Sequence, residues 1–163
     1  VAMGGFSVGE PVEQMYDGLA EVGPAMPADR PRYLMGVGRP VDLLRAIGSG
    51  IDMFDCTIPT RNGRNGQALT WQGRVNIKQA RHLREDAPLD AGCGCPVCNR
   101  YSRAYLRHLA LAGEMLMGRL LTQHNLHFYQ QLMAAAGRAI RQGDYDRFAH
   151  GTEARLAEGD EVG

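Results

Sequence analysis

The sequence predicts an α/β fold in which short parallel strands alternate with helices, followed by a metal-binding insertion and long C-terminal helices. Short apolar runs that end in glycine or a carboxylate alternate with amphipathic stretches, which is the pattern of βα units. Three cysteines fall within residues 93–98, a spacing typical of metal sites. From about residue 103 to 141, apolar residues recur at helical intervals.

The first two βα units occupy about fifty residues. Gly4–Glu10 is expected to be the end of a strand and its loop, because too little sequence precedes it for a natural domain start. Residues 11–22 carry an apolar stripe at helical spacing, opened by a proline and closed by a glycine. A second strand is expected over 32–38, where it ends in glycines, and the next helix over 40–47.

A third strand is expected over residues 51–55, because this apolar run is too short for a helix and rich in bulky side chains. It ends in Asp55, and parallel α/β proteins place their chemistry at such strand ends. The next segment is expected to be a loop in which Arg61 and Arg64 stand among glycines, on a backbone that can approach a ligand closely. The combination predicts an acid beside a phosphate-bearing substrate.

The C-terminal half has a different pattern. Residues 68–77 alternate around Gln72–Gly73, which predicts a hairpin. The helical region of residues 103–141 is expected to break near 123–125, where polar residues interrupt it. Beyond Tyr145 the tail is polar and is expected to be frayed.

The composition is that of an ordinary folded domain, with 44% hydrophobic and 22% charged residues, which excludes a disordered chain. No apolar run approaches the roughly 18 residues of a membrane span, and no signal peptide is recognisable, so a cytoplasmic location is expected. The 18 basic and 18 acidic residues cancel overall, but residues 60–107 hold nine bases against three acids. That surplus suits a polyanion, and a solvated surface is the equal alternative.

Cys93, Cys95 and Cys98 favour a metal over disulfides in a cytoplasmic protein. Zinc takes four tetrahedral ligands, and three thiolates with one imidazole would saturate it and give it a structural role. The alternative is three inert or redox-active thiols. The candidates for the fourth ligand are Cys56, His108, His124 and His127, of which His124 is preferred because the helix around it can bring the imidazole back over the cysteines.

Five stretches of the chain together resemble the bacterial tRNA-guanine transglycosylases. They are Gly4–Glu10, Tyr33–Gly38, Asp52–Cys56, Pro59–Gln67 and the cysteine cluster with its downstream His-Asn. The resemblance runs from about Gly4 to Gln131, and it implies a (β/α)8 TIM barrel with an inserted zinc subdomain. Such a barrel takes roughly 250 residues, so this chain would be its C-terminal part. Barrel units are then expected over 1–67, the hairpin, zinc subdomain and closing helices over 68–141, and a polar tail over 142–163.

The resemblance implies an enzyme, a glycosyltransferase that exchanges guanine at the anticodon wobble position for 7-aminomethyl-7-deazaguanine in queuosine biosynthesis. Asp55 would attack the ribose C1′ and form a covalent intermediate, as the nucleophile does in retaining glycosidases. Asp52 is the competing acid, and without the resemblance Asp55 would more simply be a cap or turn carboxylate.

The resemblance also implies contacts to the base and to RNA. Gly5, Glu10 and Met35 would lie at the base, although Met35 alone would be taken for a core residue and Glu10 for a helix N-terminal carboxylate. Val8 favours the bacterial version of the enzyme and thus its substrate. The residues implied to contact RNA are Gly36, Val37, Gly38, Arg39, Pro40, Val41, Asp42, Thr60, Arg61, Asn62, Gly63 and Arg64.

The implied partners are a tRNA with guanine at the wobble position, the 7-deazaguanine base and a second copy in a homodimer, with no membrane. One structural zinc per chain is expected. The family's proton-transferring aspartate has no counterpart in these 163 residues, so we expect no exchange activity from them alone. The alternative reading is a non-catalytic, zinc-containing RNA-binding or partner subunit, which would not need Asp55. A redox protein is disfavoured because the cysteines form no simple pair.

Overall fold

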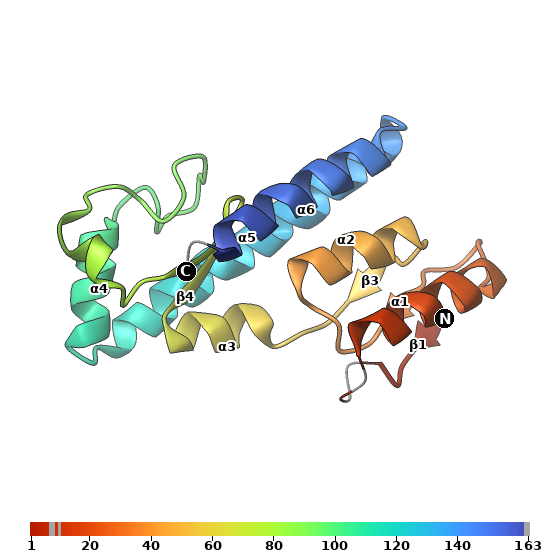
Figure 1. Cartoon of the computed structure of the whole chain (residues 1–163), viewed down its shortest axis with the longest axis horizontal. Coiled ribbons are helices and arrows are strands. Elements are labelled where there is room, and N and C mark those ends of the chain that lie inside the picture. The colour runs from red at the N-terminus through yellow and green to blue at the C-terminus, as the bar shows by residue number, and fades with distance from the viewer. Residues whose placement is uncertain (7–8, 10, 162–163) are drawn as a thin grey trace. The chain divides into compact units, whose positions relative to one another are not determined.

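The computed structural model describes residues 1–6, 9 and 11–161 (Figure 1). The chain divides into two compact units, each described here by itself. The first comprises Val1–Ile58 and Ala136–His150, and the second comprises Pro59–Ala135 and Gly151–Gly163. Within the described residues, no helix combines the length and the apolar character that a membrane span requires.

The first unit contains a parallel sheet in the order β1 (Ala2–Met3), β2 (Tyr33–Leu34) and β3 (Met53–Phe54). The helices α1 (Val12–Val22) and α2 (Pro40–Gly48) and the short η1 (Gly23–Ala25) connect these strands, as Figure 1 shows. The predicted α/β class and the order of its elements are therefore confirmed. The strands are shorter than the predicted runs, and the closed barrel stays a prediction.

Apolar side chains of α1, α2 and the strands form the core of this unit. Met15 and Leu19, one turn apart on α1, pack with Leu34 of β2. A polar contact joins the two helices, because the Tyr16 hydroxyl donates a hydrogen bond of 2.7 Å to Asp42 of α2. Burial and this bond raise the pKa of Tyr16 to about 12, so the hydroxyl stays a donor at neutral pH.

One predicted loop is wrong. The segment that carries Arg61 and Arg64 is the helix α3 (Ile58–Asn65) and not the predicted loop. Asparagine and glycine disfavour helices, but packing overrides this propensity. A Cβ on Gly63 would lie only 2.7 Å from the Thr122 backbone nitrogen, so the glycine permits a close crossing with α5 (Met115–Arg141). Gly66, at φ 90°, follows the end of the helix.

The predicted hairpin is confirmed as β4 (Gln67–Thr70) and β5 (Gly73–Asn76), which pair antiparallel. Its two-residue turn is Trp71–Gln72, one residue earlier than predicted. The Thr70 hydroxyl donates to the Gly73 carbonyl at 2.9 Å and accepts the Gln72 N–H at 3.2 Å, which closes the turn. The next element is the short helix η2 (Ala80–Arg84).

Two expectations about the C-terminal helices were wrong. The helical region breaks between α4 (Arg103–Leu111) and α5, where Gly113 adopts φ 73°, and not near residues 123–125. Two of the polar residues that suggested the break, His124 and Asn125, are buried inside the fold. The tail, expected to be frayed, forms α6 (Tyr145–Glu161), which buries Thr152 and Leu156.

Candidate catalytic carboxylate and metal centre

Asp55 directly follows β3, and its carboxylate is held by the neighbouring strand. Its Oδ1 accepts hydrogen bonds from the Tyr33 hydroxyl at 2.7 Å and from the Gly36 N–H at 2.9 Å. Tyr33 pairs with Met53 in the parallel sheet, and side chains two residues apart on a strand share a face. The register therefore brings Tyr33 and Asp55 together.

These bonds fix the charge of Asp55. The Gly36 N–H, and then the Tyr33 hydroxyl, hold the pKa of the Asp55 carboxyl below its usual range. The same bond to Asp55 raises the pKa of Tyr33. At neutral pH Asp55 is therefore an anion and Tyr33 a neutral donor. An exposed carboxylate that stays ionised suits a nucleophile.

Asp52, the competing acid, has a structural partner. Its Oδ2 accepts the Arg32 backbone N–H at 2.8 Å, which joins the beginnings of β2 and β3. Both carboxylates are exposed, but only Asp55 has a side-chain donor beside it in the hydrogen bonds found here. This geometry favours Asp55 over Asp52.

The residues expected at the base differ in their surroundings. Met35 is 47% exposed, so it is not a core residue, and its Sδ would lie 3.3 Å from a Cβ placed on Gly4. Gly5 adopts φ 92°, a conformation in which a side chain would be strained. Glu10 and Val8 lie outside the described residues.

The segment of residues 36–42 is partly buried. Val37 and Asp42 are buried, and Asp42 binds Tyr16, so their side chains serve the fold. Gly38 lies against Cys56, because a Cβ there would come within 2.2 Å of the Cys56 Sγ. Arg39, two-thirds exposed, is the cation that this segment presents.

On α3, the exposed side includes Arg61 and Arg64, which lie one turn apart. Thr60 and Asn62 are half-buried, and Gly63 is buried toward α5. Both arginines are exposed, although the base of the Arg64 side chain lies close to Gly118 of α5.

In the second unit, Cys93, Cys95, Cys98 and His124 come together, and their ligand atoms all lie within 4.8 Å of one another. The His124 Nδ1 is 3.8, 3.5 and 3.4 Å from the three sulfurs in that order. Around a tetrahedral zinc, with bonds of about 2.3 Å to sulfur and about 2.0 Å to nitrogen, this separation would be roughly 3.6 Å. The geometry therefore fits a metal, and among the described residues Cys56, His108 and His127 do not join the group.

Protonation in this group depends on burial. Burial raises the pKa values of the Cys93 and Cys98 thiols, and it lowers the pKa of His124. Neutral imidazole is the ligand form of histidine, whereas the thiols need a cation beside them to become thiolates. The His124 Nε2 lies 3.0 Å from the Leu69 carbonyl oxygen, so in the neutral ring Nε2 carries the proton and donates it to this bond. The lone pair of Nδ1 is then available to bind a metal.

Asn125, the residue after His124, is fully buried and ties α5 to the segment that carries α3. Its Nδ2 donates to the Pro59 carbonyl at 2.9 Å and to the Gln67 carbonyl at 3.0 Å. Its Oδ1 accepts the Leu69 N–H at 2.8 Å. One amide side chain thus binds the first turn of α3 and the strand that follows it.

Replacing Asn125 with alanine should destabilise the protein by about 2–4 kcal/mol, because two buried backbone groups and a partly buried one lose this partner. Urea unfolding measures the loss. Gln123→Ala, an exposed position two residues earlier on α5, is the matched control and should change stability little. Equal stabilities of the two variants would contradict this role.

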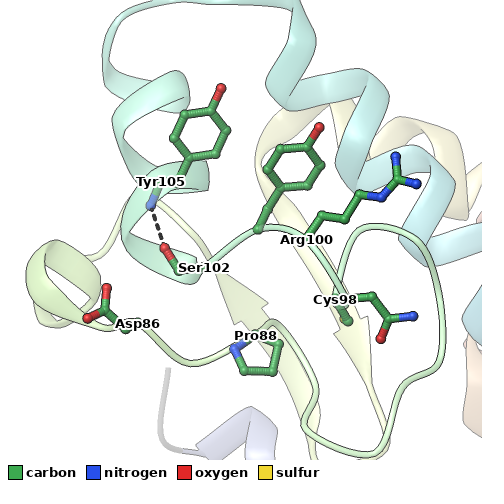
Figure 2. Close-up of a pocket in the computed structure, with 8 residues that line it drawn as sticks. Asp86, Pro88, Cys98, Arg100, Ser102 and Tyr105 are labelled. Atoms are coloured by element: carbon green, nitrogen blue, oxygen red, sulfur yellow. Dashed lines mark hydrogen bonds between the residues drawn. The ribbon is translucent and has the colours of Figure 1, made fainter.

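A pocket of about 510 Å³ lies beside the metal ligands (Figure 2). Figure 2 shows Cys98, Arg100 and Tyr105 around it, with the Ser102 hydroxyl capping α4 by accepting the Tyr105 N–H at 3.2 Å. The rings of Tyr101 and Tyr105 stack with centroids 5.4 Å apart. The metal centre therefore adjoins an aromatic surface.

Sequence reasoning gave no role to Tyr33 or to Asn125. Tyr33 lies in a stretch that carries the resemblance, but its role depends on strand register, which the sequence does not show. Asn125 follows the candidate ligand His124 in a helix that is otherwise rich in apolar residues. Its signal in the sequence was a polar side chain at a position that the helical periodicity places among buried ones.

The chain matches one family of known proteins over most of its length. The model of the queuine tRNA-ribosyltransferase family matches residues 1–158. A relative named queuine tRNA-ribosyltransferase from Sorangium cellulosum is 59% identical over 150 residues, which is 91% of this chain and 38% of the relative. A relative of the same name from Novosphingobium aromaticivorans is 57% identical, and the match covers 91% of this chain and 40% of the relative. Another, from Solidesulfovibrio magneticus, is 54% identical, and the match covers 98% of this chain and 43% of the relative.

This chain thus spans about two fifths of the length of the curated relatives it matches. The matched region includes Asp55 and all four members of the metal group. The chain therefore belongs to the queuine tRNA-ribosyltransferase family.

Proposed function

We propose that the protein is a tRNA-guanine transglycosylase, which exchanges guanine at the wobble position for 7-aminomethyl-7-deazaguanine in queuosine biosynthesis, and that Asp55 is its nucleophile. The observation that carries this proposal is the Asp55 carboxylate, exposed at a strand end and kept ionised by Gly36 and Tyr33. Membership of the family supplies the class of reaction.

In the proposed reaction, an Asp55 oxygen forms a bond to the ribose C1′ as the bond from C1′ to guanine N9 breaks. The incoming 7-deazaguanine then attacks C1′ through its N9 and displaces the carboxylate. Its N9 proton passes to the group that had protonated the departing guanine, which restores the free enzyme. Departure of guanine needs a proton, and such general acid help is typically worth about 10² to 10⁴-fold. We assign that acid to no residue of this chain.

Several groups would position the substrate. Met35, which is 47% exposed, offers a soft apolar surface to the flat base. Gly5 and Glu10 are proposed to contact the base as well. Arg39, Arg61 and Arg64 are exposed guanidinium groups suited to the phosphates of the tRNA. Such a substrate fits a cytoplasmic enzyme.

The metal is proposed to be one structural zinc per chain, held by Cys93, Cys95, Cys98 and His124. With four protein ligands the ion would have no open position and would activate no water. Its effect would be to fix α5 to the hairpin, since His124 also binds the Leu69 carbonyl of β4.

A homodimer is proposed because apolar side chains of α4 and of the start of α5 are exposed. Tyr105 is 40% exposed, Leu111 60% and Met115 91%. Large exposed apolar side chains are commonly found at interaction surfaces. Sedimentation of the purified protein, compared with Tyr105→Ala, tests the proposal.

Incorporation of labelled guanine into tRNA tests the function. For the protein extended to the full length of its relatives, we expect incorporation into a tRNA with guanine at the wobble position and none into the same tRNA with adenine there. Incorporation at other positions would contradict the proposal. Tight binding of this tRNA with no incorporation would instead support a non-catalytic RNA-binding subunit.

Tyr33→Phe should move the acid limb of the rate profile to higher pH. The variant removes one of the two described donors to Asp55, so the pKa of the carboxyl rises toward its usual value. The nucleophile must be ionised, and activity is lost as the pH falls through this pKa. Tyr16→Phe, which removes a bond to Asp42 and none to Asp55, is the control. Identical acid limbs in Tyr33→Phe and the wild type would contradict this role.

A further inference from the structure

We propose that a small cavity beside the metal group is an entry site for a divalent cation, and that His127 is the first ligand there. The cavity has a volume of about 80 Å³ and is lined only by residues of the second unit. In this role His127 speeds the uptake and the release of the metal without belonging to the final ligand set. The inference rests on the proposed zinc centre, because the entry site fills and empties it.

The cavity reaches the metal group along one edge. Cys93 and His124 line it, whereas Cys95 and Cys98 do not. Cys95 is fully buried, and Cys98 lines the larger pocket of Figure 2. A volume of this size holds a few waters, at about 30 Å³ each in the liquid, and thus a partly hydrated ion. A cation in the cavity would therefore meet two of the four final ligands at once.

One face of α5 forms part of the cavity wall. His127, Phe128 and Gln131 lie three, four and seven positions after His124, on the same side of the helix, and all of them line the cavity. The His127 imidazole is half-buried, and none of the hydrogen bonds and ion pairs among the described residues engages it. Its nitrogens are thus available to a metal, for which imidazole is a common ligand.

His127 also lies close to His124. Burial is the main cause that lowers the pKa of His124, and the charge of His127 adds to this effect. An electrostatic effect of this kind requires neighbouring rings. A cation held by His127 therefore has only a short way to the His124 Nδ1 and to the Cys93 sulfur, which lies 3.8 Å from that nitrogen.

The charge of the cavity lining attracts cations. Asp90 contributes a carboxylate, and no arginine or lysine is among the described residues that line the cavity. Each oxygen of Asp90 accepts one backbone N–H at 3.1 Å, from Trp71 or from Gly92, and retains lone pairs that can face a cation. The pocket beside Cys98 instead includes Arg100, whose guanidinium repels divalent ions. The metal group is therefore more accessible to a cation from the side of this cavity.

Ligand exchange in the cavity uses donors of this chain. His127 and Cys93 bind the incoming ion and displace part of its water, and His124 and the two remaining sulfurs then replace His127. The three thiols give their protons to the solvent as their sulfurs bind the metal. Release follows the same steps in reverse, so His127 lowers the barrier in both directions and leaves the affinity unchanged.

The test is the rate of zinc release from His127→Ala, in the protein extended to the full length of its relatives. Zinc-loaded protein is mixed with a coloured chelator at concentrations where the rate no longer depends on the chelator. Equilibrium competition with the same chelator gives the zinc affinity. We expect release to be roughly tenfold slower in the variant, with an unchanged affinity. Because the affinity is the ratio of the two rates, uptake is then slower by the same factor.

Two further substitutions of His127 separate metal binding from packing. His127→Cys supplies another zinc ligand and should restore most of the rate, whereas His127→Gln binds zinc poorly and should not. His108→Ala is the matched control, because His108 is an exposed histidine of α4 and does not line the cavity. Asp86→Ala, in the pocket beside Cys98, tests entry from that side. Both should release zinc at the wild-type rate.

Four outcomes would overturn the proposal. Equal release rates in wild type and His127→Ala would show that the cavity holds only water. Equal slowing in His127→Ala and His108→Ala would show a general effect of lost histidines. Slower release in Asp86→Ala alone would move the entry site to the pocket beside Cys98. Weaker zinc affinity with faster release in His127→Ala would make His127 a support of the final site.

These outcomes are distinct from a failure of the zinc centre. Wild-type protein that holds no zinc contradicts the proposed centre itself, whereas zinc-loaded wild type with a release rate that His127→Ala leaves unaltered overturns the entry site alone. Thermal melting of the zinc-loaded variants establishes that they fold. If His127→Ala fails to fold, His127→Gln replaces it with the same slow release expected, and an unchanged rate in that variant overturns the proposal in the same way.

Discussion

In a protein of the full length of its relatives, Asp55→Ala should abolish guanine exchange and the covalent capture of tRNA. The variant removes the oxygen that would bond to C1′, and losses of a catalytic nucleophile commonly reach about 10³-fold or more in kcat. Asp55→Asn should be nearly as severe, because an amide is a poor nucleophile although it keeps the shape. Exchange of labelled guanine and a denaturing gel of labelled tRNA with the protein provide the two measurements.

Asp52→Ala is the control for this prediction. Asp52 binds the Arg32 N–H, so the variant should lose some stability but retain covalent capture. Turnover near the wild-type rate in Asp55→Asn, with capture lost in Asp52→Ala, would transfer the role to Asp52.

His124→Ala should release the metal and unfold the surrounding segment. A structural zinc site contributes its binding energy to folding, about 10–16 kcal/mol in zinc-finger peptides, and removal of one of four ligands forfeits much of it. Metal analysis after dialysis and far-UV circular dichroism measure the two effects. We expect less than one equivalent of zinc in the variant and a lower melting temperature.

His127→Ala provides the matched control, since His127 lies on the same helix but outside the ligand group. It should retain zinc. Undiminished zinc affinity in His124→Ala, with zinc lost from His127→Ala, would reassign the fourth ligand.

The elements best predicted from the sequence are those whose signal is local. Helices α1 and α2 show a stripe of apolar residues between a proline and a glycine, and both were predicted within one residue of their observed bounds. The three cysteines lie within six residues, and the choice of His124 among four candidates needed only one helix to approach them. Local spacing therefore sufficed for these parts of the fold and of the metal site.

The errors arose where distant packing decides the structure. In α3, Gly63 reads as a loop residue, but it is needed for the approach of Thr122, which lies 59 positions later. His124 and Asn125 read as a helix break because polar residues are normally exposed, yet their partners are backbone groups of β4 and its neighbours. Partners so far away in sequence leave no pattern in a single chain.

The two bonds at Leu69 have a consequence for following metal loading in solution. Its N–H is donated to Asn125, and its carbonyl oxygen binds the imidazole of His124, so consecutive side chains of α5 hold both sides of one residue. When the ion is removed by a chelator, the imidazole loses one of its two anchors and the Leu69 peptide gains freedom. Hydrogen–deuterium exchange at the Leu69 amide should therefore accelerate before the rest of β4 opens, so this single amide would report the state of the metal centre.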